Sequence, residues 1–251
     1  KGIIPGEFLI PANTNLFGVV NYITNPRNIY YYKITLVEGQ TIAQFLQLIA
    51  SNPNLTGDIF KVEEGTMMPD TYYFSRGSTR AELITRATEA MDKYLADLWE
   101  NRNTDLPFKN KKEALVLASM VEKETGVARE RDLIAGLFIN RLRYGYKLQS
   151  DPTVAYGLGK ASADKLTKKD LTTVHPYNTY TMYGLPIAPI ANPSRESLRA
   201  VFFPADTKYL YFVADGSGGH IFTINLKDHN IEVAKWREIE RGIRQRESKA
   251  N

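Results

Sequence analysis

Residues 114–125 read ALVLASMVEKET, a stretch in which apolar side chains occupy nearly every position before two glutamates end it. Apolar residues that recur at spacings of three and four predict an α-helix. We therefore predict an unusually apolar helix over about residues 112–125, and the elements on either side follow from it.

Helices are predicted on both sides of this segment. Thr79 followed by Glu82 is a capping-box signal for a long upstream helix, whose apolar face ends near Leu98. Downstream we expect a helix over about residues 129–144. A short helix opens at Ser150-Asp151-Pro152, with Asp151 as the capping side chain before the proline.

Residues 1–60 are predicted as a small α/β unit. Strand, turn and helix follow one another twice, which suggests a weak internal repeat, with strands at 7–10 and 30–37 and helices at 16–23 and 42–49. Near the C-terminus, strands are expected at 209–214 and 220–224, joined by a glycine-rich turn, and a last helix from about Asp228.

Strands and helices mix without a regular βαβ alternation, which favours the α+β class over a doubly wound sheet. We divide the chain into a small module at residues 1–60 and a larger mixed domain at residues 61–251.

The composition is that of an ordinary globular protein with a mild basic excess. The 251 residues have a net charge of +4 and include no cysteine, which excludes disulfides and thiolate chemistry. The basic clusters at 109–112 and 241–246 are interpreted as solvated surface, with a weak preference for anionic polymers as the alternative.

No signal peptide or spanning helix is visible in the sequence. The apolar run from Ala114 to Val121 is far shorter than the roughly 20 residues that a membrane span needs. Because the chain begins at Lys1 and not at a methionine, we expect a trimmed or mature piece of a longer protein.

Several common site types are not represented. The histidines His175, His220 and His229 lack a metal-ligand spacing such as H-E-x-x-H, so structural or hydrogen-bonding roles are expected for them. Neither a G-x-x-x-x-G-K phosphate loop nor a G-x-S-x-G nucleophile elbow occurs. We expect no metal and no cofactor.

Two glutamates close the apolar helix. On a helical wheel Glu124 lies roughly 55° from the mean apolar direction and Glu122 roughly 105° away, so Glu124 is better placed to be half buried. Burial would raise the pKa of the Glu124 carboxyl and suit it to act as a general acid near neutral pH. A solvated helix end beside Lys123 and Lys112 is the alternative, and the residues alone favour it.

Rings and amides are dense in the proline-rich loop at 174–194 and just before it. Such a rigid, ring-lined loop is typical of a functional segment. Rings can stack on sugar faces, but tyrosines are also common at the edges of any core, so both interpretations stay open. The residues concerned are Gln149, Tyr156, Tyr177, Asn178, Thr179, Tyr180 and Tyr183.

Five ordered blocks carry a family resemblance. They are LASMVEKE at 117–124, FINRL at 138–142, LQSDPTVAYG at 148–157, YNTY with GLP at 177–180 and 184–186, and YFVADG with GH at 211–216 and 219–220. In this order and spacing the chain resembles the YceG-like endolytic murein transglycosylases over about residues 60–245.

The resemblance implies an enzyme that cleaves the bond between N-acetylmuramic acid and N-acetylglucosamine within nascent peptidoglycan strands. The product ends in a 1,6-anhydro sugar and no water is consumed. The family's catalytic glutamate is the second acidic residue of the E-K-E block, here Glu124, with Glu122 as the reserve candidate. The cleft is expected to be lined by Gln149, Ser150, Asp151, Tyr177, Asn178 and Tyr180.

The resemblance also implies where such an enzyme works. Family members lie at the periplasmic face of the inner membrane, anchored by one N-terminal helix that this chain does not include. Their substrate is the peptidoglycan strand, and peptidoglycan synthases are expected partners. Residues 37–41 resemble the turn of the family's LysM-like glycan-binding module, which is expected to be incomplete here.

Three other functions compete. A hydrolytic muramidase would need a second carboxylate across the cleft, for which Asp151 is the candidate, and would leave reducing ends. A non-catalytic glycan-binding scaffold would function unchanged after Glu124→Gln. Nucleic-acid binding rests on mild basicity and rings alone, and the charges do not cluster enough for it, so no nucleic-acid partner is expected.

Overall fold

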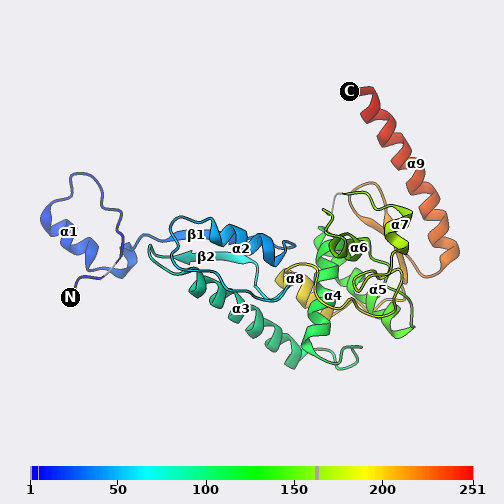
Figure 1. The fold of residues 1–251 in the computed structure, drawn as a ribbon, viewed down its shortest axis with the longest axis horizontal. Coiled ribbons are helices and arrows are strands. Elements are labelled where there is room, and N and C mark those ends of the chain that lie inside the picture. Colours follow the sequence, from blue (N-terminus) through cyan, green and yellow to red (C-terminus); the bar gives the residue numbers. More distant parts are fainter. Residues whose placement is uncertain (1, 5, 162–163, 251) are drawn as a thin grey trace.

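The computed structural model describes residues 2–4, 6–161 and 164–250 of the chain. Three parts follow one another along an elongated molecule (Figure 1). An N-terminal segment carries α1 (Leu16–Ile23) and the 3-10 turn η1 (Pro26–Asn28). A small module holds the first strand pair, and a larger domain is built around α4 (Lys111–Glu124).

The N-terminal segment does not form the first half of the expected repeat. The strand predicted at 7–10 is wrong, because in that stretch Phe8 alone pairs, in an isolated antiparallel bridge to Ile29. Helix α1 forms where it was predicted and is capped by Asn15, but none of its residues is buried. Without a buried face, α1 lies apart from the other helices in Figure 1.

The small module is a two-stranded sheet flanked by two helices (Figure 1). Strand β1 (Tyr32–Leu36) pairs antiparallel with β2 (Asp70–Phe74), and alternate residues such as Ile34 and Leu36 point into the core. Helices α2 (Ile42–Ala50) and α3 (Arg80–Asn101) supply most of the rest of that core, to which the loop residues Leu55 and Met67 also belong.

The capping box predicted for α3 is present, since Thr79 and Glu82 each bond the backbone N–H of the other. The core of the small module continues past residue 60, where we placed the boundary, because β2 and the first half of α3 complete it. The LysM-like identity of this module stays a prediction.

Helix α4 is the centre of the larger domain. Every residue from Ala114 to Val121 is buried, which an almost uniformly apolar helix requires. Around it pack the end of α3 and three further helices: α5 (Arg131–Arg143), α6 (Asp151–Gly157) and α8 (Arg195–Phe202). The short elements η2 (Ala128–Glu130) and α7 (Lys168–Thr172) connect them.

A hairpin and a long helix end the fold. Strands β3 (Tyr211–Ala214) and β4 (His220–Thr223) pair antiparallel across the predicted glycine-rich turn. Helix α9 (Leu226–Ala250) packs on this hairpin and then extends away from the domain (Figure 1). The mixture of helices with two small antiparallel sheets confirms the α+β class. No helix in the described part of the chain is both long and apolar enough to cross a membrane.

The turn at 37–41 joins the small module to the larger domain. The Gly39 N–H donates to the carbonyl of Asn192 at 2.9 Å, and the Asn192 N–H donates to the carbonyl of Gln40 at 2.9 Å. Lys123 Nζ donates to the Gly39 carbonyl at 3.1 Å. Glu64 accepts from the Ile42 N–H at 2.8 Å and from the Tyr156 hydroxyl at 3.0 Å. We call this junction between the small module and the larger domain the seam, and each of the two parts donates hydrogen bonds to the other across it.

Candidate active site

A pocket of about 520 Å³ opens beside the C-terminal end of α4. Its walls come from α4, α5, the segment at 148–151, the loop at 174–194, β3 and α9. It is lined by Glu124, Arg141, Leu148, Gln149, Asp151, Tyr180, Tyr211, Phe212, Leu226, His229, Asn230, Val233 and Arg237.

Glu124 is the last residue of α4 and is partly buried, as the helical wheel predicts. Burial raises the pKa of its carboxyl to about 7, and a hydrogen bond from the Ser150 hydroxyl to Oε1, 2.5 Å long, opposes part of that rise. The protonated form is therefore well populated near neutral pH. Such a carboxyl can donate a proton and take it back.

Glu122 has a different environment on another face of α4. Its Oε2 accepts from the Ser194 N–H at 2.9 Å, the Ser194 hydroxyl at 2.5 Å and the Ser197 hydroxyl at 2.7 Å. Both serines lie at the start of α8, where an anion stabilises the unpaired N–H groups of a helix. Glu122 therefore anchors α8, and it does not line the pocket.

A left-handed residue directs Ser150 at Glu124. Gln149 has φ 54°, and its N–H donates to the Thr179 carbonyl at 3.1 Å. The Ser150 N–H donates to the Thr179 hydroxyl at 2.9 Å. These two bonds fix the segment at 148–151 against the loop at 174–194, so that the Ser150 hydroxyl reaches the carboxyl.

Asp151 lies in the same pocket but is not the predicted helix cap. The N-cap of α6 is Ser150, which makes no capping bond because its hydroxyl is bonded to Glu124. Asp151 is the first helical residue, and its Oδ1 accepts from the Tyr180 hydroxyl at 2.5 Å. Burial first, and then this bond, raise the pKa of Tyr180, so its hydroxyl stays a donor.

Of the six residues expected to line the cleft, Gln149, Asp151 and Tyr180 border the pocket. The Ser150 hydroxyl donates to the Glu124 carboxyl, whereas Tyr177 and Asn178 do not line the pocket. Asn178 is 1% exposed, and its amide nitrogen bonds the carbonyls of Asp170, Leu171 and Thr173. Tyr177 packs against Tyr156, with ring centroids 5.0 Å apart. Asn178 shapes the loop that carries Tyr180, because the asparagine Oδ1 accepts from the Tyr180 N–H at 2.9 Å.

Arg141 is a pocket residue that we did not predict. It is 7% exposed, donates from Nε to the Leu210 carbonyl at 2.6 Å and from Nη1 to the Gln149 Oε1 at 3.2 Å, and lies over the Tyr211 ring at 5.2 Å. An arginine close behind the apolar run at 134–139 was the available signal, since a charge that is buried there must find partners. The α9 residues gave no such signal, because their spacing looks like that of any amphipathic helix.

The histidines have the hydrogen-bonding and packing roles that the sequence suggested. His220 Nδ1 lies 2.7 Å from Glu130 Oε2, and the His220 N–H donates to Oε1 of the same residue at 2.9 Å. His175 Nδ1 accepts from the Tyr177 N–H at 3.2 Å. His229 stacks on Tyr211. Within the described residues, no group of three or more histidine or acidic side chains is placed to hold a metal ion.

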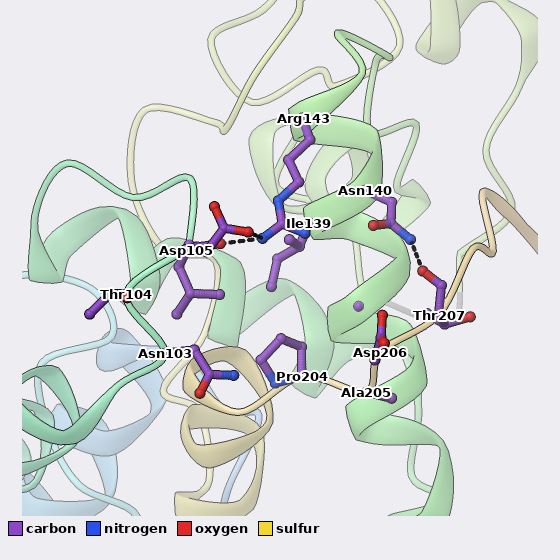
Figure 2. Close-up of a pocket in the computed structure, with 12 residues that line it drawn as sticks. Asn103, Thr104, Asp105, Ile139, Asn140, Arg143, Pro204, Ala205, Asp206 and Thr207 are labelled. Carbon is purple, nitrogen blue, oxygen red and sulfur yellow. Dashed lines mark hydrogen bonds and ion pairs between the residues drawn. The ribbon is translucent and has the colours of Figure 1, made fainter.

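A second cavity, of about 370 Å³, lies on another face of α5 (Figure 2). Two pairs of its polar groups bond each other. Arg143 forms an ion pair with Asp105 at 2.9 Å, and the Asn140 amide donates to the Thr207 carbonyl at 2.7 Å. This cavity presents no acid comparable to Glu124.

Comparisons with known proteins identify the family of this chain. A model of the YceG-like family matches residues 1–235. An endolytic murein transglycosylase from Bacillus subtilis is 32% identical over an alignment of 270 residues, which covers 94% of this chain and 74% of that protein. A protein of the same name from Streptococcus pneumoniae strain D39 is 32% identical over 202 residues, 78% of this chain and 36% of that protein.

A solved structure matches as well. The crystal structure of a yceG-like protein from Listeria monocytogenes has a TM-score of 0.64 to this chain at 30% identity, covering 86% of this chain and 80% of that one. Family match, sequence relatives and fold thus agree over most of the chain, which belongs to the YceG-like family.

Proposed function

We propose that this chain is an endolytic murein transglycosylase, which cleaves the MurNAc–GlcNAc bond within peptidoglycan strands and leaves a 1,6-anhydroMurNAc end. Cutting nascent strands in this way would end their elongation. The observation that carries the proposal is the Glu124 carboxyl, which has a raised pKa and lies in a pocket open to a polymer. The names of the Bacillus and Streptococcus relatives support the substrate and the reaction.

In the first step the protonated Glu124 donates its proton to the glycosidic oxygen. The bond between the muramyl C1 and that oxygen breaks, its electron pair stays on the oxygen, and the GlcNAc unit leaves with a hydroxyl. Positive charge develops at C1. The pKa of about 7 suits this step, because about half of an acid with that value is protonated near neutral pH and it still gives up its proton readily.

In the second step the Glu124 carboxylate removes the proton from the muramyl C6 hydroxyl, and O6 bonds to C1. The carboxyl is then protonated again, so the atoms balance without water. Ordinary glycosidases use a carboxylate on each side of the bond. Here the substrate's own hydroxyl is the nucleophile, so one carboxylate serves both steps.

The other pocket residues hold the sugar and the acid. The Ser150 hydroxyl occupies Glu124 Oε1, which leaves Oε2 to face the substrate. Gln149, Asp151 and Tyr180 present amide, carboxylate and hydroxyl groups to sugar hydroxyls. Asn178 would position Tyr180 by holding the loop that carries it. Tyr177 lies outside the pocket and would support the same loop.

The place of action is part of the proposal. We place the enzyme on the periplasmic face of the inner membrane, held by a helix ahead of residue 1 and working beside peptidoglycan synthases. Fractionation of cells that produce the natural full-length protein tests this. The protein is expected in the membrane fraction and open to externally added protease, and recovery in the cytoplasm would contradict the placement.

The reaction is tested by digesting purified strands in water enriched in ¹⁸O and weighing the products. A transglycosylase gives ends that are lighter by one water than hydrolytic ends, carry no ¹⁸O and resist borohydride. Reducing ends labelled with ¹⁸O would overturn the proposal in favour of a muramidase, with Asp151 as the candidate base.

A further inference from the structure

Helix α9 presents one face to the pocket that contains Glu124. Its lining residues are Leu226, His229, Asn230, Val233 and Arg237, at spacings of three, four, seven and eleven from the first. Residues with that spacing share one side of a helix. At a rise of 1.5 Å per residue this side extends for roughly 16 Å, so α9 forms a wall along the pocket.

Packing fixes this wall in place. The His229 ring stacks on Tyr211 at 5.1 Å and 25°, and the guanidinium of Arg141 lies 5.2 Å from the centroid of that same tyrosine ring. Further along α9, Ile239 and Trp236 approach the hairpin turn so closely that a Cβ at Gly216 would lie 3.0 and 3.7 Å from them. Arg237 therefore has a defined position on the wall.

Among the pocket residues that the structure describes, Arg237 is the exposed cation. Arg141 is buried, and its Nε and Nη1 already donate to carbonyls and to Gln149. Arg237 is exposed, and among the residues that the structure describes no hydrogen bond or ion pair engages its guanidinium. The Glu124 carboxyl is about half protonated near pH 7, and Asp151 accepts a bond from Tyr180.

The substrate offers one kind of anion. The glycan chain of murein carries hydroxyls and amides and no charge, whereas the lactyl group of each muramyl residue bears a peptide with free carboxylates. A guanidinium binds a carboxylate through two parallel hydrogen bonds. We propose that Arg237 binds a carboxylate of this peptide stem, so that the enzyme selects strands that carry stems over bare strands. This inference rests on the proposed function.

The test compares cleavage of stem-bearing strands with cleavage of strands freed of stems by an amidase, whose newly exposed lactyl carboxylates are converted to neutral amides before use. Arg237→Gln is expected to raise KM for stem-bearing strands roughly tenfold, equivalent to about 1.4 kcal/mol, and to raise the KM for bare strands much less. Arg237→Lys should recover part of the loss. The matched control is Arg241→Gln, which removes the same charge one turn further along, where the side chain does not line the pocket.

Binding separates this inference from the proposed reaction. In a Glu124→Gln background, where no cleavage is expected, both kinds of strand are titrated onto protein with and without Arg237→Gln. The inference is supported if Arg237→Gln selectively lowers the affinity for stem-bearing strands and if added salt shrinks this difference between the two proteins. That result would stand even if the reaction proves to be hydrolysis. An equal effect on both substrates, or none on either, overturns the inference.

Discussion

Two glutamates two residues apart act differently because of the hydroxyls that reach them. Glu124 accepts from Ser150 and Glu122 from Ser194, both at 2.5 Å. Glu122 also receives two further donors at the start of α8, whereas Glu124 faces a pocket. The helical wheel placed Glu124 nearer the apolar side, although the residues alone favoured a solvated helix end, and in the structure both carboxylates are partly buried. The wheel could not supply the serines, because they lie 26 and 72 residues away along the chain.

Ser150→Ala should shift the pH dependence of cleavage. The Ser150 hydrogen bond lowers the pKa of Glu124 against the rise that burial causes, so its loss raises that pKa further. Activity requires the protonated acid, and we expect the alkaline limb of the kcat/KM profile to move to higher pH by up to about one unit.

The matched control is Ser194→Ala, which removes an equally short bond from Glu122 and the N-cap of α8. It should lower the free energy of unfolding by about 1–2 kcal/mol and leave the pH profile unchanged. Identical profiles for the parent and Ser150→Ala would contradict the assignment of Glu124 as the titrating acid.

Stability also depends on pH through Glu124. Its pKa rises from 4.5 to about 7 on folding, so between those values the folded state binds more protons than the unfolded state. Stability therefore falls as pH rises through this window, and the burial cost is complete above pH 7.

Glu124→Gln removes that cost. Relative to the parent, the variant should gain stability between pH 5 and pH 8, on the order of 1–2 kcal/mol after allowance for partial exposure. Thermal melts at the two pH values measure it. A difference in melting temperature that does not change with pH would mean that the carboxyl titrates at its ordinary value.

At the scale of elements, the sequence predicts helices well where local signals and burial agree. The capping box of Thr79 located the start of α3, and the apolar run at 114–121 predicted α4 to within one residue at each end. The strand at 7–10 failed because its strand-like residues find no partner beyond Ile29. A strand needs a neighbouring strand to pair with, and the sequence alone does not show whether one is present.

The attachment of α9 to the hairpin can be tested at one turn. Gly216 and Gly218 both have positive φ, 84° and 95°, so an alanine at either position is strained. A Cβ at Gly216 would also lie 3.0 Å from Ile239, whereas nothing lies within 4 Å at Gly218. Gly216→Ala should therefore destabilise the protein more than Gly218→Ala, by about 1 kcal/mol or more, and raise KM by moving the α9 wall. Equal melting temperatures for the two variants would refute this packing.

At the scale of the whole molecule, the seam between the small module and the larger domain positions the two. Asn192 is fully buried there, and its amide group donates to the Gln40 carbonyl at 3.0 Å and accepts from the Met67 N–H at 3.1 Å. Met67 and Met68 enter the two separate cores, one each. The sequence indicated both parts of the chain, but these contacts join residues more than 120 positions apart and no local pattern reveals them.

Asn192→Ala should loosen the seam. It leaves the buried Met67 N–H without its partner, which costs about 1–3 kcal/mol. At roughly 2–4 °C for each kcal/mol, the melting temperature should fall by several degrees, and limited proteolysis should open the chain between the two parts. Asn15→Ala, which removes the cap of the unburied α1, is the control and should change neither property by a similar amount. Comparable behaviour of the two variants would show that the seam does not stabilise the fold.

The central claim is that one carboxyl, Glu124, carries the cleavage. It is tested most directly by mass spectrometry of glycan strands after incubation with the parent, with Glu124→Gln and with Glu122→Gln. We predict anhydro-ended fragments from the parent and from folded Glu122→Gln, and none from Glu124→Gln. Anhydro-ended fragments from Glu124→Gln at the rate of the parent would contradict the account.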